Sequence, residues 1–89
     1  MKVLFERSFL SDVHAVTDRK ALKKLSELIG LLKSARSLSD IPNLKKLKGH
    51  TSAFRIKLGD FRIGLFLVEG TLILVKFQNR KDIYRGFPH

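Results

Sequence analysis

The sequence contains no cysteine, and its eight acidic residues are far outnumbered by 18 lysines and arginines. Without cysteine the chain can form neither a disulfide nor a thiolate metal site, which fits a reducing compartment such as the cytoplasm. Only three successive apolar residues precede Glu6 and Arg7, so we expect neither a signal peptide nor a membrane span. Eighty-nine residues with 44% hydrophobic content predict a single globular domain, which we place at residues 1–89.

Residues that commonly carry metal or acid–base chemistry are also scarce. The three histidines, His14, His50 and His89, lie far apart and lack the spacing of metal ligands. The carboxylates are scattered, and no glycine-rich phosphate loop or Ser/His/Asp arrangement is present. We therefore expect no metal and no cofactor, and His50 is the only histidine near the basic segment described next.

What the chain does have is positive charge, with a formal net charge of +10. Such a charge predicts attraction to nucleic acid, to an anionic membrane or to an acidic protein. Membrane binding favours a long basic amphipathic helix, whereas the centre of the basic density is predicted as sheet, so nucleic acid or an acidic partner is preferred. The basic residues gather in the middle third and near the end, at Lys45, Lys46, Lys48, Arg55, Lys57 and Arg62, and then at Arg80, Lys81 and Arg85.

The stretch AFRIKLGDFRIG, residues 53–64, predicts a β-hairpin. Apolar and basic residues alternate, which places the basic ones on one face of a sheet. Gly59 suits the first position of a type II′ turn, which would set Lys57 opposite Arg62 and leave Arg55 on the same face. Like charges directly opposite are destabilising, which favours an anion-binding role. A merely solvated basic face explains the stretch equally well.

The N-terminal third predicts one short strand and two helices. Residues 2–6 are compatible with a strand, and Ser8 is a candidate N-cap for a short helix. Asp18 is the candidate N-cap of an amphipathic helix over residues 19–35, whose leucine stripe we interpret as core. Gly30 weakens this helix, and we expect it to permit close packing on the first helix.

The remaining chain predicts a connector, a three-strand meander and a tail. Residues 44–49 are interpreted as a connector, and residues 71–77 as a strand in the centre of the sheet because both of its faces are apolar. Residues 82–84 are too short to assign, and residues 87–89 are expected to form a tail. This order predicts an antiparallel sheet with both helices on one face and the basic residues on the other, which is a plausible RNA platform.

RNA would supply its own nucleophile, the ribose 2′-OH. A cluster of cations could bind the scissile phosphate and stabilise the charge of its transition state. Neighbouring cations favour the neutral form of a lysine, so Lys57 is a candidate general base. Tyr84, the only tyrosine, could orient the hydroxyl or stack on a base.

Three segments together resemble a known family. They are Leu47-Lys48-Gly49, the hairpin from Phe54 to Arg62, and Asn79-Arg80-Lys81-Asp82-Ile83-Tyr84-Arg85. The chain is similar over nearly its whole length to the RelE/ParE superfamily of bacterial type II toxins, whose members carry a similar L-K-G, a basic-x-basic strand, G-D-[YF]-R and a closing R-[KR]-x-[IV]-Y. The resemblance implies a RelE-like α+β fold, with two N-terminal helices packed on one face of an antiparallel sheet. For RelE-like members it also implies cleavage of mRNA in the ribosomal A site, by 2′-OH attack on the adjacent phosphate without a metal.

The resemblance also implies roles for five residues. Lys57 would be the general base, Arg62 would stabilise the transition state, and Arg80 would bind the phosphate or assist the leaving 5′ oxygen. Arg55 would bind RNA, and Tyr84 would orient the 2′-OH or stack on a base. Phosphate or ribosome binding is further assigned to Lys45, Lys46 and Lys48. Two positions depart from the pattern: Arg55 stands where the best-known members have lysine, and Asn79 stands where many have histidine.

A small acidic antitoxin is the partner that the resemblance implies, in a toxin–antitoxin hetero-oligomer. The charge of +10 fits such a partner independently. Two alternatives stay open. One is a ParE-like inhibitor of DNA gyrase or a catalytically inactive relative, and the other is a non-enzymatic RNA-binding module.

Overall fold

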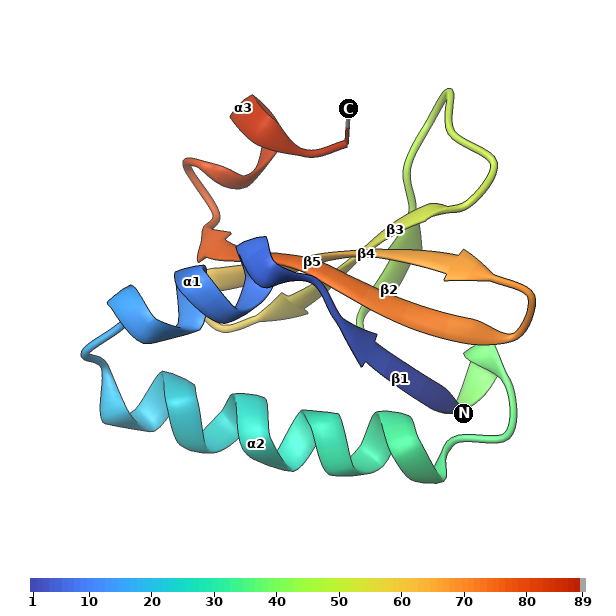
Figure 1. Ribbon diagram of the computed structural model, residues 1–89, viewed down its shortest axis with the longest axis horizontal. Helices are drawn as coiled ribbons and strands as arrows, with labels where there is room; N and C mark the ends of the chain where they lie inside the picture. Colours follow the sequence, from blue (N-terminus) through green and yellow to red (C-terminus); the bar gives the residue numbers. More distant parts are fainter. Residues whose placement is uncertain (89) are drawn as a thin grey trace.

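A five-stranded sheet forms the centre of the computed structural model, which describes residues 1–88 (Figure 1). The spatial order of its strands is β1-β5-β4-β3-β2. All neighbours are antiparallel except β1, which pairs in parallel with β5 at one edge. The strands are β1 (Lys2–Phe5), β2 (Leu44–Lys46), β3 (Ala53–Leu58), β4 (Phe61–Val68) and β5 (Thr71–Asn79). This arrangement confirms the predicted α+β class and the central position of residues 71–77.

Four helical segments complete the fold: α1 (Arg7–Ala15), α2 (Arg19–Ser34), the 3-10 turn η1 (Leu38–Asp40) and the short α3 (Ile83–Gly86). Helix α2 lies along one side of the sheet, and α3 lies on the other side (Figure 1). The predicted cap of α2 is confirmed, because the Asp18 carboxylate accepts a hydrogen bond from the Ala21 N–H at 3.1 Å. Among residues 1–88, no helix is both long and apolar enough to cross a bilayer.

The main core lies between the helices and one face of the sheet. Leu25, Leu28 and Leu32 of α2 are buried, as the leucine stripe predicted. Burying one such side chain contributes roughly 1.5–3 kcal/mol, so this layer provides much of the stability. The sheet and α1 contribute Phe9, Ile56, Ile63, Leu65, Leu72, Leu74 and Phe77.

Helix α1 also closes an edge of the sheet. Strand β1 ends at Phe5, which leaves the later part of β5 without a strand partner on that side. The prediction of Ser8 as the N-cap of α1 is wrong, because Glu6 holds that position. The Ser8 hydroxyl instead donates a hydrogen bond to the Val75 carbonyl at 2.6 Å. The Asp12 carboxylate accepts from the Phe77 N–H at 2.9 Å. Two side chains of α1 thus satisfy backbone groups that a further strand would otherwise take.

Three further expectations about local structure are wrong. Residues 44–46 form strand β2 on the edge of β3 rather than a connector. The segment 87–89 does not begin as a free tail, because Phe87 is buried with Ala53 and Ile83 in a second small core. Gly30 does not pack closely on α1: a Cβ built there meets nothing within 4 Å. These features depend on contacts between distant segments, which local sequence patterns do not contain.

Candidate active site

The β3–β4 hairpin places two cations directly opposite each other. Its register pairs Lys57 with Arg62 and Leu58 with Phe61, as predicted. Gly59 has a φ of +59°, which suits a glycine at the first turn position. The Cβ atoms of directly opposite residues lie about 5 Å apart, so the two long side chains can reach one common ligand.

The neighbouring strands extend this basic face. Arg55 lies opposite Gly64 of β4 on one side and opposite Lys45 of β2 on the other. Since successive strand residues alternate between faces, Lys45, Arg55, Lys57 and Arg62 all share the face opposite to α2. We call these four residues the basic cluster.

Arg62 is the most enclosed member of the basic cluster, with 9% of its surface exposed. Its Nη1 donates to the carbonyl oxygens of Gly59 and Phe61, both at 2.8 Å. A guanidinium has five N–H donors in a rigid plane, so these two bonds fix its orientation and leave the Nη2 and Nε groups to bind an anion. Arg62 therefore both stabilises the hairpin turn and presents an oriented cation.

Arg55 and Lys57 are both anchored to the Asn43 carbonyl, just before β2. The Arg55 Nη1 donates to it at 2.7 Å, and the Lys57 backbone N–H donates to it at 3.2 Å. The Lys57 side chain itself is exposed. The one ion pair found within residues 1–88 joins Arg85 to Asp82 at 3.8 Å, so no carboxylate in this part of the chain neutralises the basic cluster.

The C-terminal segment returns to the basic face. The Arg80 backbone N–H donates to the Asp60 carbonyl at 2.8 Å, which holds Arg80 beside the hairpin turn. Further on, α3 packs on the same face over Ala53 and Phe66, with Tyr84 57% exposed on it. Of the residues predicted from sequence, the fold therefore brings Arg80 and Tyr84 to the face that carries the basic cluster.

Gly64 lets the C-terminal segment approach the sheet closely. A Cβ at this position would lie 2.7 Å from two ring atoms of Phe87, so only glycine fits beneath the ring. Gly64 stands between Arg62 and Phe66 on the basic face. The buried Phe87 ring thus forms an apolar boundary directly beside the basic cluster.

Other predicted residues lie apart from the basic cluster. Lys46 pairs with Phe54 and so belongs to the other face, at the sheet edge. Lys48 and His50 are exposed in the loop between β2 and β3, and His89 lies outside the described residues. Lys76 is a further cation that the sequence pattern did not indicate: it lies opposite Gly64, next to a register shift. Only that irregular register gives it a place on the basic face.

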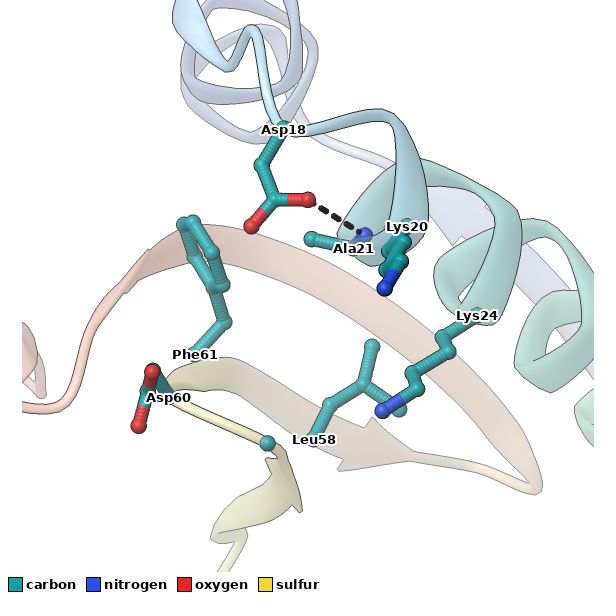
Figure 2. Close-up of a pocket in the computed structure, with 8 residues that line it drawn as sticks. Asp18, Lys20, Ala21, Lys24, Leu58, Asp60 and Phe61 are labelled. Carbon is teal, nitrogen blue, oxygen red and sulfur yellow. Dashed lines mark hydrogen bonds between the residues drawn. The ribbon is translucent and has the colours of Figure 1, made fainter.

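A pocket of about 230 Å³ lies behind the hairpin turn, between the turn and the start of α2. Figure 2 shows Asp18 capping Ala21, with Lys24 reaching over Leu58. The walls of this pocket carry both lysines and carboxylates, so the pocket lacks the single sign of charge that the basic face presents. Within residues 1–88, no three His, Asp or Glu side chains gather in a way that could hold a metal ion.

A curated relative, and not a family model, shows the family of this chain. No family model matches the chain. The toxin RelE3 of Methanocaldococcus jannaschii is 35% identical to it over 89 residues, which cover 99% of this chain and 100% of that protein.

Solved structures share the fold. The toxin–antitoxin complex RelB-RelE from Methanococcus jannaschii matches with a TM-score of 0.81 and 30% identity, covering 96% of this chain and 99% of that one. The RelE-RelB complex from Pyrococcus horikoshii matches with a TM-score of 0.71 over 89% of this chain and 93% of that one, and its 16% identity shows the fold alone. The full-length similarity to RelE3 shows that the chain belongs to the RelE family of type II toxins.

Proposed function

We propose that this toxin is an endoribonuclease that cleaves mRNA in the ribosomal A site. The observation that carries the proposal is the pairing of Lys57 with Arg62 across the hairpin, with Arg80 held at the same turn. Three cations without a carboxylate partner in residues 1–88 provide a site for one phosphate. In the reaction the substrate 2′-OH attacks the adjacent phosphate.

Lys57 is the proposed general base. In its neutral form its Nζ takes the proton of the 2′-OH while the O2′–P bond forms. Arg62 stabilises the negative charge that develops on the phosphate oxygens, and its two carbonyl contacts orient it before the substrate arrives. An oriented donor needs no reorganisation during the reaction, which supports this role.

The second half of the step breaks the P–O5′ bond. The products are a 2′,3′-cyclic phosphate and a 5′-hydroxyl, whose proton comes from Lys57 or from water. The Arg80 guanidinium stabilises the negative charge on the leaving 5′ oxygen. The exposed Tyr84 ring on α3 supports the ribose or stacks on a base.

Binding of the larger partners uses the remaining cations. Arg55 and Lys45 lie in the basic cluster and would contact the mRNA backbone, whereas Lys46 and Lys48 lie at the sheet edge and in the adjoining loop. The latter two are better placed for ribosomal RNA. Such phosphate contacts make affinity fall with salt concentration.

The proposed protein partner is a small acidic antitoxin. The net charge of +10 supports an acidic partner. Two relatives with the same fold were solved as complexes of RelE with RelB. A toxin–antitoxin hetero-oligomer is therefore the proposed resting form of this chain.

Lys57→Ala tests the chemical role directly. We expect single-turnover cleavage of ribosome-bound mRNA to slow by about 10²–10⁴-fold, the usual contribution of a general base, while ribosome binding falls far less. Lys23→Ala is the matched control, since it removes the same charge from the exposed surface of α2. Equal losses of rate and binding for Lys57→Ala would make this residue a phosphate anchor instead.

Induction of the toxin in cells tests the target. Prompt arrest of protein synthesis, with mRNA cut within codons on the ribosome, is the expected outcome. Arrest of DNA synthesis with cleaved gyrase complexes would instead support a gyrase inhibitor. Binding to ribosomes without any cleavage would identify a non-enzymatic module.

A further inference from the structure

Lys76 is a half-buried cation of β5 whose direction is set by an irregularity of the sheet. Leu74 is buried in the main core, so strict alternation along β5 would turn Lys76 toward the core as well. Leu74 pairs with Leu65 of β4, however, and Lys76 pairs with the adjacent residue of that strand, Gly64. Val75 is thus an extra residue, a β-bulge, and it turns Lys76 to the basic face.

Helix α1 holds this bulge in place. The Ser8 hydroxyl donates to the Val75 carbonyl at 2.6 Å, and the Asp12 carboxylate accepts from the Phe77 N–H at 2.9 Å. The two hydrogen bonds flank Lys76 along the chain, so they fix the direction in which its side chain leaves the backbone. Bulges of this kind are common beside active sites, where they re-aim a side chain. The arrangement points to a ligand for Lys76 on the basic face.

The position of Lys76 relative to Arg62 indicates what that ligand is. Arg62 pairs directly with Gln78, which lies two residues beyond Lys76 on the same strand. Arg62 and Lys76 are therefore diagonal neighbours on one face, with Cβ atoms about 7–8 Å apart. This separation is close to that of consecutive phosphates in a nucleic-acid strand. An RNA chain whose scissile phosphate lies at Arg62 can therefore place a neighbouring phosphate at Lys76.

The other cation in this row of the sheet is separated from Lys76. Arg55 and Lys76 both lie opposite Gly64, on its two sides. The buried Phe87 ring occupies the space above Gly64, where a Cβ would lie 2.7 Å from it. Arg55 also donates to the Asn43 carbonyl, on the side of β2. Since no ion pair in residues 1–88 involves Lys76, its charge is available to a phosphate on the β5 side.

We propose that Lys76 binds the phosphate next to the scissile one, so that the basic face holds two consecutive phosphates of a single RNA strand. The inference rests on the proposed endoribonuclease function and adds a second phosphate subsite to it. A contact with a phosphate that does not react is the same in the ground state and in the transition state. It therefore acts on KM and leaves kcat unchanged.

Lys76→Gln tests the subsite with ribosomes that carry a synthetic mRNA. We expect KM to rise by about tenfold, the usual effect of one hydrogen bond to a charged group. The value of kcat and the melting temperature should stay unchanged. Lys76→Arg keeps the charge and should retain the original KM. Lys23→Gln, which removes an exposed lysine of α2, is the matched control and should leave both constants unchanged.

A change in the RNA identifies the phosphate itself. A methylphosphonate linkage has no charge, and it can be placed on either side of the scissile linkage. At one of these two positions, we expect the KM of the unmodified toxin to rise as much as Lys76→Gln raises it with ordinary mRNA. Combining this linkage with Lys76→Gln should cost nothing more, because both changes remove the same contact.

The outcomes separate the subsite from the function on which it rests. An unchanged KM for Lys76→Gln, or losses that add at both flanking linkages, overturns the subsite and leaves the endoribonuclease intact. A fall in kcat alone overturns it as well, because Lys76 would then take part in the chemistry. So does a loss of affinity for the antitoxin with normal cleavage, which would identify a protein contact.

The measurement with the unmodified toxin does not depend on how any variant folds. If neither flanking methylphosphonate raises its KM, the subsite is overturned whatever the stability of Lys76→Gln. If the unmodified toxin cleaves no mRNA on the ribosome, the proposed function is overturned, and the subsite with it.

Discussion

The two faces of the sheet are covered in different ways. One face is closed by α1 and α2 over a continuous core, which contains all but one of the largest fully buried side chains. Within residues 1–88, the core on the other face is the small cluster of Ala53, Ile83 and Phe87, where α3 packs on the sheet. Beyond that cluster, the end of the sheet at the hairpin turn presents cations.

This difference shows how the fold tolerates like charges in register. Lys57 opposite Arg62 costs about 0.2–1 kcal/mol, the usual size of a cross-strand pair effect. A single buried leucine or isoleucine on the helical face contributes roughly 1.5–3 kcal/mol. Stability comes mainly from the helical face of the sheet. The residues of the other face can therefore be those that suit binding of a ligand, even at a small cost in stability.

Arg62→Ala should have the largest effect, and it should fall on activity. We expect mRNA cleavage and growth arrest to decrease by more than about 100-fold, as when an oriented transition-state donor is removed elsewhere. Loss of the two hydrogen bonds to the turn should also lower the free energy of unfolding by about 1–3 kcal/mol. Thermal melting and antitoxin binding would show that the variant still folds, and full toxicity would remove Arg62 from the site.

Leu72→Ala should have the next largest effect, and it should fall on stability. Leu72 is fully buried on the helical face, so we expect a loss of about 2–5 kcal/mol in urea unfolding. Its neighbour Ile73 lies opposite Phe66 on the other face and is half-buried, so Ile73→Ala should cost less. Cleavage per folded molecule should persist in both variants. Equal destabilisation would contradict the division between the two faces.

Gly64→Ala should have the smallest effect of the three and should act on both properties. The added methyl meets the Phe87 ring, so we expect a cost of about 1–3 kcal/mol from overpacking. Cleavage should also weaken, because Arg80 and Tyr84 belong to the displaced segment. In a double-mutant cycle, Gly64→Ala should cost less when Phe87 is already Leu. Strict additivity would show that the ring does not set the position of that segment.

The hairpin could be predicted from sequence because its determinants are local. Alternating residues, a glycine at the turn and the two-residue loop fixed the Lys57–Arg62 register. The capping role of Asp18 could be predicted for the same reason, since an N-cap bonds only to the residues that follow it. The order of the predicted elements and the family resemblance both gave the expectation of an α+β fold, and the topology agrees with it.

The missed features have causes that the local sequence pattern does not contain. The role of Ser8 depends on Val75, far along the chain, and four residues of α3 give no periodic signal. Lys76 follows a register shift, so alternation counted along the strand misplaces it. Gly30 was expected to pack against the first helix. In the structure a Cβ at Gly30 meets nothing within 4 Å, and the sequence alone does not reveal this open space.

The contact between α1 and β5 has a consequence for how the molecule avoids self-association. An uncovered strand edge is a template onto which another chain can add a strand, and proteins commonly protect such edges. Here Ser8 and Asp12 occupy the backbone groups of β5 that such a strand would use. Fraying of α1 would therefore expose an unpaired strand edge as well as weaken the fold, and we expect aggregation to follow it.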